Sequence, residues 1–127
     1  MTSNRDLAAL LYLGNAAVLA THEIDSAFWH EWKLFHLPGG IQVFLILNLA
    51  LLLLVLYGFM KVVLWQPGAR IFSFFLAGVG IFAFVIHTVF ISTGHPEFRL
   101  PVSIGLLGST LLLSIAQIFV TVRIEEV

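Results

Sequence analysis

The sequence predicts an all-α integral membrane protein, folded as an up-down-up-down four-helix bundle. Of its 127 residues, 60% are hydrophobic and only 10% are charged, a composition too apolar for an ordinary soluble domain. Four long apolar stretches follow one another, and short segments rich in Gly and Pro separate the later ones. Because helices joined by short connections run antiparallel, we expect a single transmembrane domain over residues 1–127.

The boundaries of the four spans are predicted from the Gly and Pro residues between them. After Gly14 no Gly or Pro occurs until Pro38, so we expect the first helix to continue to about Trp32. The fourth helix should begin at Pro101, because proline is favoured in the first turn. Each later span exceeds the roughly 20 residues that cross a bilayer core. The predicted spans are about 3–32, 41–65, 70–93 and 101–124.

The composition excludes several classes of protein. The chain has no cysteine, which excludes disulfides, thiolate metal sites and cysteine nucleophiles. Its formal net charge is -1 and its Lys and Arg residues form no run, so nucleic acid is not an expected partner. The first apolar segment lacks the basic start and the Ala-x-Ala site of a cleaved signal peptide. We therefore expect it to remain as the first helix.

Basic residues at the helix ends predict the orientation of the bundle. The end with more Lys and Arg usually faces the cytoplasm. One end of the predicted bundle carries four of the six: Arg5, Lys61, Arg70 and Arg123. Both termini lie at this end and are expected to be cytoplasmic. All five histidines then lie toward the outer end, together with most of the carboxylates.

The stretch from Thr21 to Trp32 places histidines and carboxylates at the end of an apolar span. Ionisable groups are costly near hydrocarbon, so they usually pair, bind a ligand or relay protons. His22 lies about 22 Å up the first helix from Leu7 at the usual helical rise, and His87 lies about 25 Å up the third helix from its start. Since both helices run in the same direction, the two imidazoles are expected at similar depth across the bundle interior.

These residues favour a site for a divalent metal or a small polar ligand. His22 and Asp25 lie three positions apart on one helix face, and His87 adds a second imidazole. Two imidazoles and a carboxylate suit zinc, iron or manganese, with an open position for water or substrate. We expect His30 and His95 to support such a site.

Other interpretations of the same residues stay open. Glu23 is the candidate general base if the metal site is catalytic, but the sequence does not decide whether the protein is an enzyme. His22 and His87 could instead be the axial ligands of a haem, which would leave the carboxylates without a role. A third interpretation requires no ligand at all: His22 and Asp25 form an interfacial pair, and His87 bonds a backbone carbonyl or an Asn.

Functions without a ligand are also compatible with the sequence. Asn15, Asn48 and Gln117 could form part of a proton path, but no carboxylate lies at mid-depth, so interhelical amide hydrogen bonds explain them better. The competing functional hypothesis is a noncatalytic accessory subunit or assembly factor that docks its polar cluster on a membrane-protein partner. A homo-oligomer is compatible as well, and the lipid bilayer is the expected surrounding.

Three short motifs follow one another along the outer end of the predicted bundle. They are Thr21-His22-Glu23-Ile24-Asp25, Trp29-His30-Glu31-Trp32 and Leu37-Pro38-Gly39-Gly40. The set resembles a family of small bacterial integral membrane proteins of uncharacterised function, and the similarity covers most of the chain. The resemblance implies the four-helix fold and carries over no activity or ligand. We expect the protein in a bacterial inner membrane.

Overall fold

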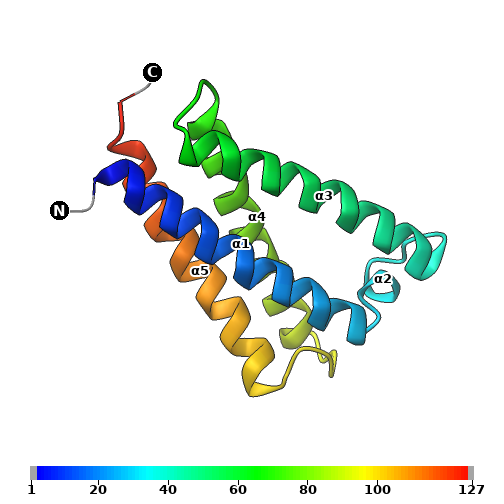
Figure 1. Cartoon of the computed structure of the whole chain (residues 1–127). Coiled ribbons are helices and arrows are strands. Elements are labelled where there is room, and N and C mark those ends of the chain that lie inside the picture. Colours follow the sequence, from blue (N-terminus) through cyan, green and yellow to red (C-terminus); the bar gives the residue numbers. More distant parts are fainter. Residues whose placement is uncertain (1–2, 126–127) are drawn as a thin grey trace.

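The computed structural model describes residues 3–125, and it confirms the all-α prediction. The helices are α1 (Asn4–Phe28), α2 (Glu31–Leu34), α3 (Gly40–Val63), α4 (Ala69–Ser92) and α5 (Pro101–Val122) (Figure 1). Within the described residues, the four long helices have the length and apolar composition needed to cross a membrane. The structure therefore indicates an integral membrane protein built as a four-helix bundle.

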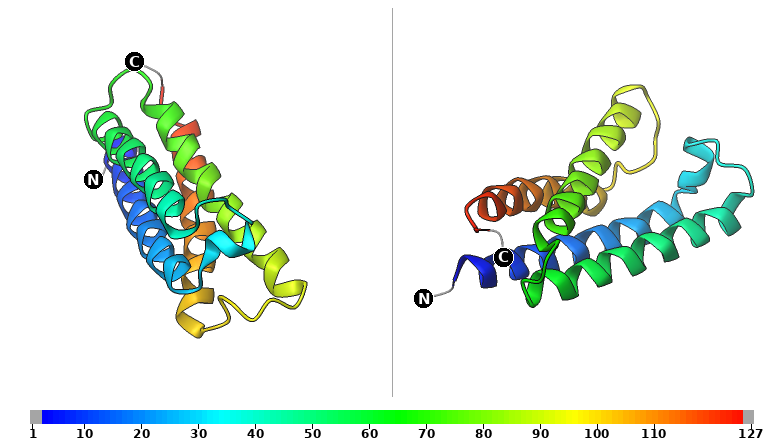
Figure 2. Two further views of the ribbon diagram at one scale, coloured as in Figure 1. Left: turned by 90° about the vertical axis from the view of Figure 1, so that its right-hand side faces the viewer. Right: turned by 90° about the horizontal axis from the view of Figure 1, so that it is seen from above.

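The four long helices alternate in direction along the bundle. Both termini lie at the same end as the turn between α3 and α4, whereas α2 and the α4–α5 connection lie at the opposite end (Figure 1). Helix α5 packs against α1 and α4, and α1 also contacts α3 (Figure 2). The elements at the opposite end can therefore bring residues from α1, α2 and α4 together.

The first helix ends earlier than its sequence predicts. It stops at Phe28, and the expected continuation to about Trp32 is wrong because His30 adopts a left-handed conformation with φ 55° and ψ 49°. The chain then forms the single turn α2 instead of extending α1. Neither Gly nor Pro marks this break, whereas Pro101 is the first residue of α5 as predicted.

The interior between α1, α4 and α5 is held together by hydrogen bonds. The Asn15 amide nitrogen donates to Ser114 Oγ at 3.0 Å and to Gln117 Oε1 at 3.1 Å, and Thr110 Oγ1 donates to Asn15 Oδ1 at 2.7 Å. The Gln117 amide nitrogen donates in turn to the Ser73 carbonyl at 2.8 Å. All five residues are buried. Asn15 and Gln117 thus join helices as expected, whereas the Asn48 amide nitrogen donates to the Phe44 carbonyl of its own helix. The bonds between helices fit the low hydrophobic driving force for helix association in lipid.

Candidate metal centre

His22 on α1 and His87 on α4 lie next to each other inside the bundle. Their ring centroids are 4.6 Å apart with the rings nearly perpendicular, and each residue is only 1% exposed. The helical rise places them at similar depth, because α1 and α4 run in the same direction through the bundle. The two imidazoles therefore lie in the same buried environment.

Glu31 reaches the same place from α2. After the left-handed residue His30, the short helix carries the Glu31 side chain into the interior, where its Oε1 lies 3.4 Å from His87 Nε2. Glu31 is 7% exposed. Sequence reasoning missed this residue as a member of the site, because a continuous first helix would not turn the chain back at His30. No Gly or Pro in the sequence signals that turn.

The proton on His87 can be assigned from its hydrogen bond. Its Nδ1 lies 2.8 Å from the carbonyl oxygen of Ala83, and a carbonyl can only accept, so Nδ1 carries the proton. In the neutral ring Nε2 then has a bare lone pair directed at the Glu31 carboxylate. His87 Nε2 and Glu31 Oε1 are then both acceptors, and two acceptors lie 3.4 Å apart favourably only when a proton or a cation is between them.

Three buried atoms of this group make no hydrogen bond with the described residues. They are His22 Nδ1, His87 Nε2 and Glu31 Oε2. An unsatisfied buried polar atom typically costs about 1–3 kcal/mol, so three in one place are unusual without a ligand. A proton on His87 Nε2 would bond to Glu31 Oε1 but would leave His22 Nδ1 and Glu31 Oε2 without partners among the described residues. A cation that accepts several lone pairs would satisfy more of them.

The Glu31 side chain supplies negative charge to the group. Burial acts to raise the pKa of its carboxyl, but contacts with His87 and Ser26 and the neighbouring imidazoles outweigh burial and lower the pKa below its ordinary value. Glu31 is therefore ionised at neutral pH. An anionic carboxylate beside two imidazoles is a donor set for a divalent cation.

The spacing of these donor atoms is compatible with one ion. His22, Glu31 and His87 each offer one ligand atom, and the three atoms lie within 4.8 Å of one another. Small side-chain rotations would bring them to the roughly 2.1 Å that zinc ligands adopt. Three protein ligands leave at least one coordination position for water or another molecule.

Asp25, the predicted third ligand, and Glu23, the predicted general base, lie outside the group of His22, Glu31 and His87. The Asp25 carboxylate accepts a hydrogen bond from the Trp29 indole nitrogen at 3.0 Å, and it is not one of the three converging ligands. Glu23 lines a cavity between α1 and α3. It still lies within electrostatic range of Glu31 and His87. The structure thus brings together His22 and His87 from the predicted set and adds Glu31.

The two histidines predicted to support the site are exposed. The His30 ring packs edge-on against Trp32, with centroids 5.1 Å apart. His95 Nδ1 lies 3.8 Å from a Glu97 carboxylate oxygen. Neither belongs to the converging group of ligand atoms. His30 instead affects the site through its backbone, because its left-handed conformation positions Glu31.

Phe98, in the connection between α4 and α5, covers the two imidazoles. It is fully buried, and its ring centroid lies 4.3 Å from that of His87 and 5.7 Å from that of His22. A hydrophobic cover of this kind limits solvent access to a metal site and lowers the local dielectric. Sequence reasoning did not single out Phe98, because one phenylalanine among twelve carries no distinctive signal.

The fold and the centre together define a class: a four-helix membrane protein with a buried group of two histidines and one glutamate. The chain belongs to a family of unknown function, DUF6713, whose sequence model matches residues 8–124. That range contains all three residues of the group, and it confirms the expectation of an uncharacterised family. Comparisons with curated proteins and with solved structures found no match.

Proposed function

We propose that the protein binds a divalent metal ion such as zinc, iron or manganese through His22, Glu31 and His87. The observation that carries the proposal is the convergence of three buried side chains, each with one polar atom that makes no hydrogen bond with the described residues. The fixed proton on His87 Nδ1 leaves Nε2 free for a metal, and a backbone carbonyl is a common partner of a ligating imidazole. Haem is the weaker alternative, because Glu31 would have no role in it.

Asp25 takes a supporting role in this proposal. Its carboxylate is held by Trp29 and interacts electrostatically with His22, so it favours positive charge at the centre without ligating the metal. If the open coordination position serves a reaction, Glu23 is the general base that we propose, since it lies within electrostatic range of Glu31 and His87. A metal bound there would polarise a coordinated oxygen or acidify a coordinated water.

Elemental analysis of gently solubilised protein tests the metal proposal. We expect about one divalent ion per chain, and its loss in His22→Ala and His87→Ala. His36→Ala is the matched control, because His36 is exposed and lies outside the group. An absorption spectrum of the same sample separates haem from a non-haem metal. Absence of metal in the purified protein, together with unchanged melting after chelation, would overturn the proposal.

We further propose that the protein lies in a bacterial inner membrane with both termini cytoplasmic. The support is the unequal distribution of basic residues between the two ends of the bundle. The centre would then face the outer side. A noncatalytic accessory role remains the competing function, and native purification distinguishes it: a stoichiometric partner that His22→Ala releases without changing metal content would favour it.

A further inference from the structure

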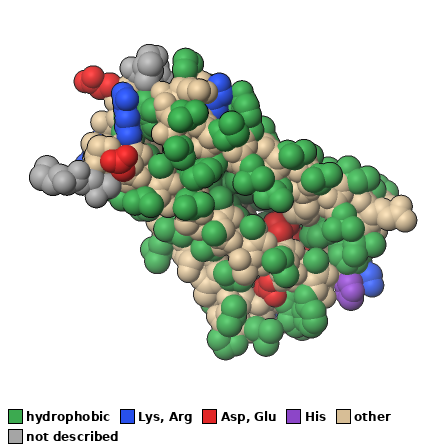
Figure 3. Space-filling model, in the orientation of Figure 1, with side chains coloured by type: hydrophobic (Ala, Val, Ile, Leu, Met, Phe, Trp, Pro, Cys, Tyr) green, Lys and Arg blue, Asp and Glu red, His purple; other side chains and the backbone are tan. Residues whose placement is uncertain are grey.

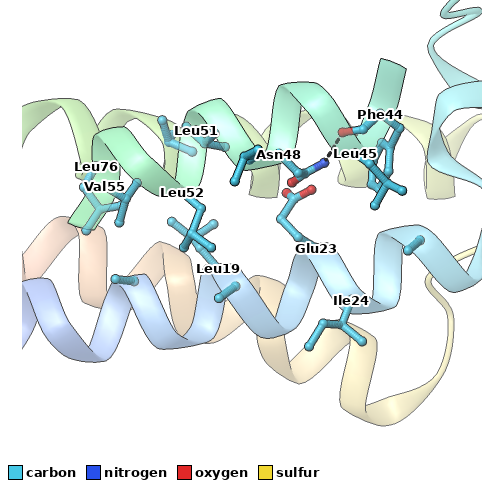
Figure 4. Close-up of a pocket in the computed structure, with 15 residues that line it drawn as sticks. Leu19, Glu23, Ile24, Phe44, Leu45, Asn48, Leu51, Leu52, Val55 and Leu76 are labelled. Carbon is cyan, nitrogen blue, oxygen red and sulfur yellow. Dashed lines mark hydrogen bonds between the residues drawn. The ribbon is translucent and has the colours of Figure 1, made fainter. Parts of the chain in front are cut away.

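A second site lies beside the metal centre, between α1 and α3. Residues of these two helices, with Leu76 and Val79 of α4, line a partly open cavity of about 330 Å³, a volume within the usual range of small-molecule pockets. Its walls are almost entirely aliphatic and include Leu19, Ile24, Leu45, Leu52, Val55 and Leu76 (Figure 4). Because it lies between two membrane-spanning helices, its contents would come from the hydrocarbon phase.

One position in this cavity is polar. Glu23 from α1 and Asn48 from α3 point toward each other across it (Figure 4). The Asn48 amide nitrogen donates to the Phe44 carbonyl at 3.0 Å, and the Asn48 side chain is also a hydrogen-bond partner of the Glu23 carboxyl group. Because a carboxylate has two oxygens, Glu23 keeps lone pairs for a further donor. A ligand that satisfies this position must donate hydrogen bonds.

The charge around Glu23 favours a cation. Glu23 itself carries the negative charge of this position; of its charged neighbours, Glu31 adds to that charge and His87 opposes it. On the face shown in Figure 3, acidic side chains lie among hydrophobic ones with no Lys or Arg beside them in the described part of the chain. A positively charged head with N–H donors complements both the charge and the hydrogen-bonding capacity of this position.

We propose that the cavity binds a single-chain amphiphile with a primary-amine head. The hydrocarbon chain occupies the aliphatic walls, and the ammonium group donates to Glu23 and Asn48. Burial of the chain supplies most of the affinity and the carboxylate supplies selectivity for the head. This site extends beyond the metal proposal, because the metal ligands and the cavity lining are different residues. Glu23 is the one residue that both proposals use, as the head-group partner here and as the general base above.

The test uses the full chain in phosphatidylcholine nanodiscs and measures bound dodecylamine, dodecanol and dodecanoic acid by native mass spectrometry. We expect one dodecylamine per chain, with the alcohol and the acid bound at least tenfold more weakly. Glu23→Gln should remove the preference for the amine. Glu97→Gln is the control, because Glu97 lies at the same end of the bundle but outside the cavity.

A second variant tests the aliphatic part of the cavity, which would hold the hydrocarbon chain of the ligand, separately from the polar part that would hold its amine head. Leu52→Trp fills the cavity from an exposed site, so it should block dodecylamine while the protein stays folded. Each titration is repeated after chelation, and metal content is measured in Glu23→Gln. Unchanged metal content and unchanged amine binding after chelation keep the two proposals separate. Equal binding of amine and alcohol, equal binding by Glu23→Gln and wild type, or no bound amine would each overturn the inference.

Discussion

At the scale of single residues, His87 shows most clearly how the centre is prepared for a cation. Its Nδ1 proton is committed to the Ala83 carbonyl, so the other nitrogen can only accept in the neutral ring. That nitrogen faces a carboxylate whose pKa is lowered, and Phe98 keeps water away. Either a proton between His87 and Glu31 or a divalent ion at the proposed centre would supply positive charge between these two acceptors.

The role of Glu31 can be tested by an isosteric change. Glu31→Gln keeps the shape of the side chain but removes its charge, so we expect the metal affinity to fall by more than about tenfold. Competition with a fluorescent chelator measures the affinity. The matched control is Glu97→Gln, a carboxamide change at the same end of the bundle. Equal affinities in both variants would exclude Glu31 as a ligand.

Part of this centre could be predicted from the sequence. The depths of His22 and His87 follow from helical rise alone, so their proximity in the structure was predictable. Glu31 was not, because its position depends on a left-handed backbone at His30, and a histidine gives no reliable signal for that conformation. The same limit applies to Phe98, which also has a positive φ of 64°.

At the scale of elements, the break between α1 and α2 decides whether Glu31 can reach the interior. Left-handed backbone costs a non-glycine residue about 1–2 kcal/mol, so the packing of α2 must offset that cost. The helix boundaries marked by Gly and Pro were predictable to within a few residues. The break at His30 lacks such a marker and depends on tertiary contacts.

A pair of substitutions at His30 separates its backbone role from its imidazole. His30→Gly accepts the left-handed conformation readily, so we expect retained metal and equal or higher stability. His30→Val removes the same imidazole but disfavours the conformation, so it should lower the melting temperature and the metal content. Metal loss in both variants would show that the His30 imidazole itself is required.

The contact between α4 and α5 depends on a glycine. A Cβ added at Gly80 would clash with the hydroxyl oxygens of Ser114 and Thr110, whereas one added at Gly78 would meet no atom within 4 Å. We expect Gly80→Ala to destabilise the protein by about 1–3 kcal/mol and Gly78→Ala to be neutral or slightly stabilising. Thermal unfolding in one detergent compares them. Equal stabilities would mean that α4 and α5 are not closely packed.

At the scale of the whole molecule, the bundle places its polar groups in separate regions. The proposed metal centre lies near the end away from the termini, and the cavity between α1 and α3 extends from the level of Phe44 toward the middle of the bundle. Asn15 and Gln117 form a hydrogen-bonded interior between α1, α4 and α5. The up-down-up-down order was predictable because the connections are short. The cavity was not, since it depends on how closely α1 and α3 approach each other.

The proposed orientation can be measured with single cysteines, because the chain has none of its own. Gln66→Cys lies in the α3–α4 turn at the end that carries the termini, and His36→Cys lies at the opposite end; both positions are exposed. In intact bacterial cells, a membrane-impermeant maleimide should label His36→Cys and leave Gln66→Cys unlabelled. The reverse pattern would place the termini outside.

The hydrogen bonds of Asn15 have a consequence for biogenesis. Asn15 belongs to the first helix to be synthesised, yet its partners Thr110, Ser114 and Gln117 belong to the last. Its amide therefore stays without these partners in the membrane until α5 has been inserted. We therefore expect α1 to stay in contact with the insertion machinery during this interval, and to be released into the bilayer when α5 is inserted.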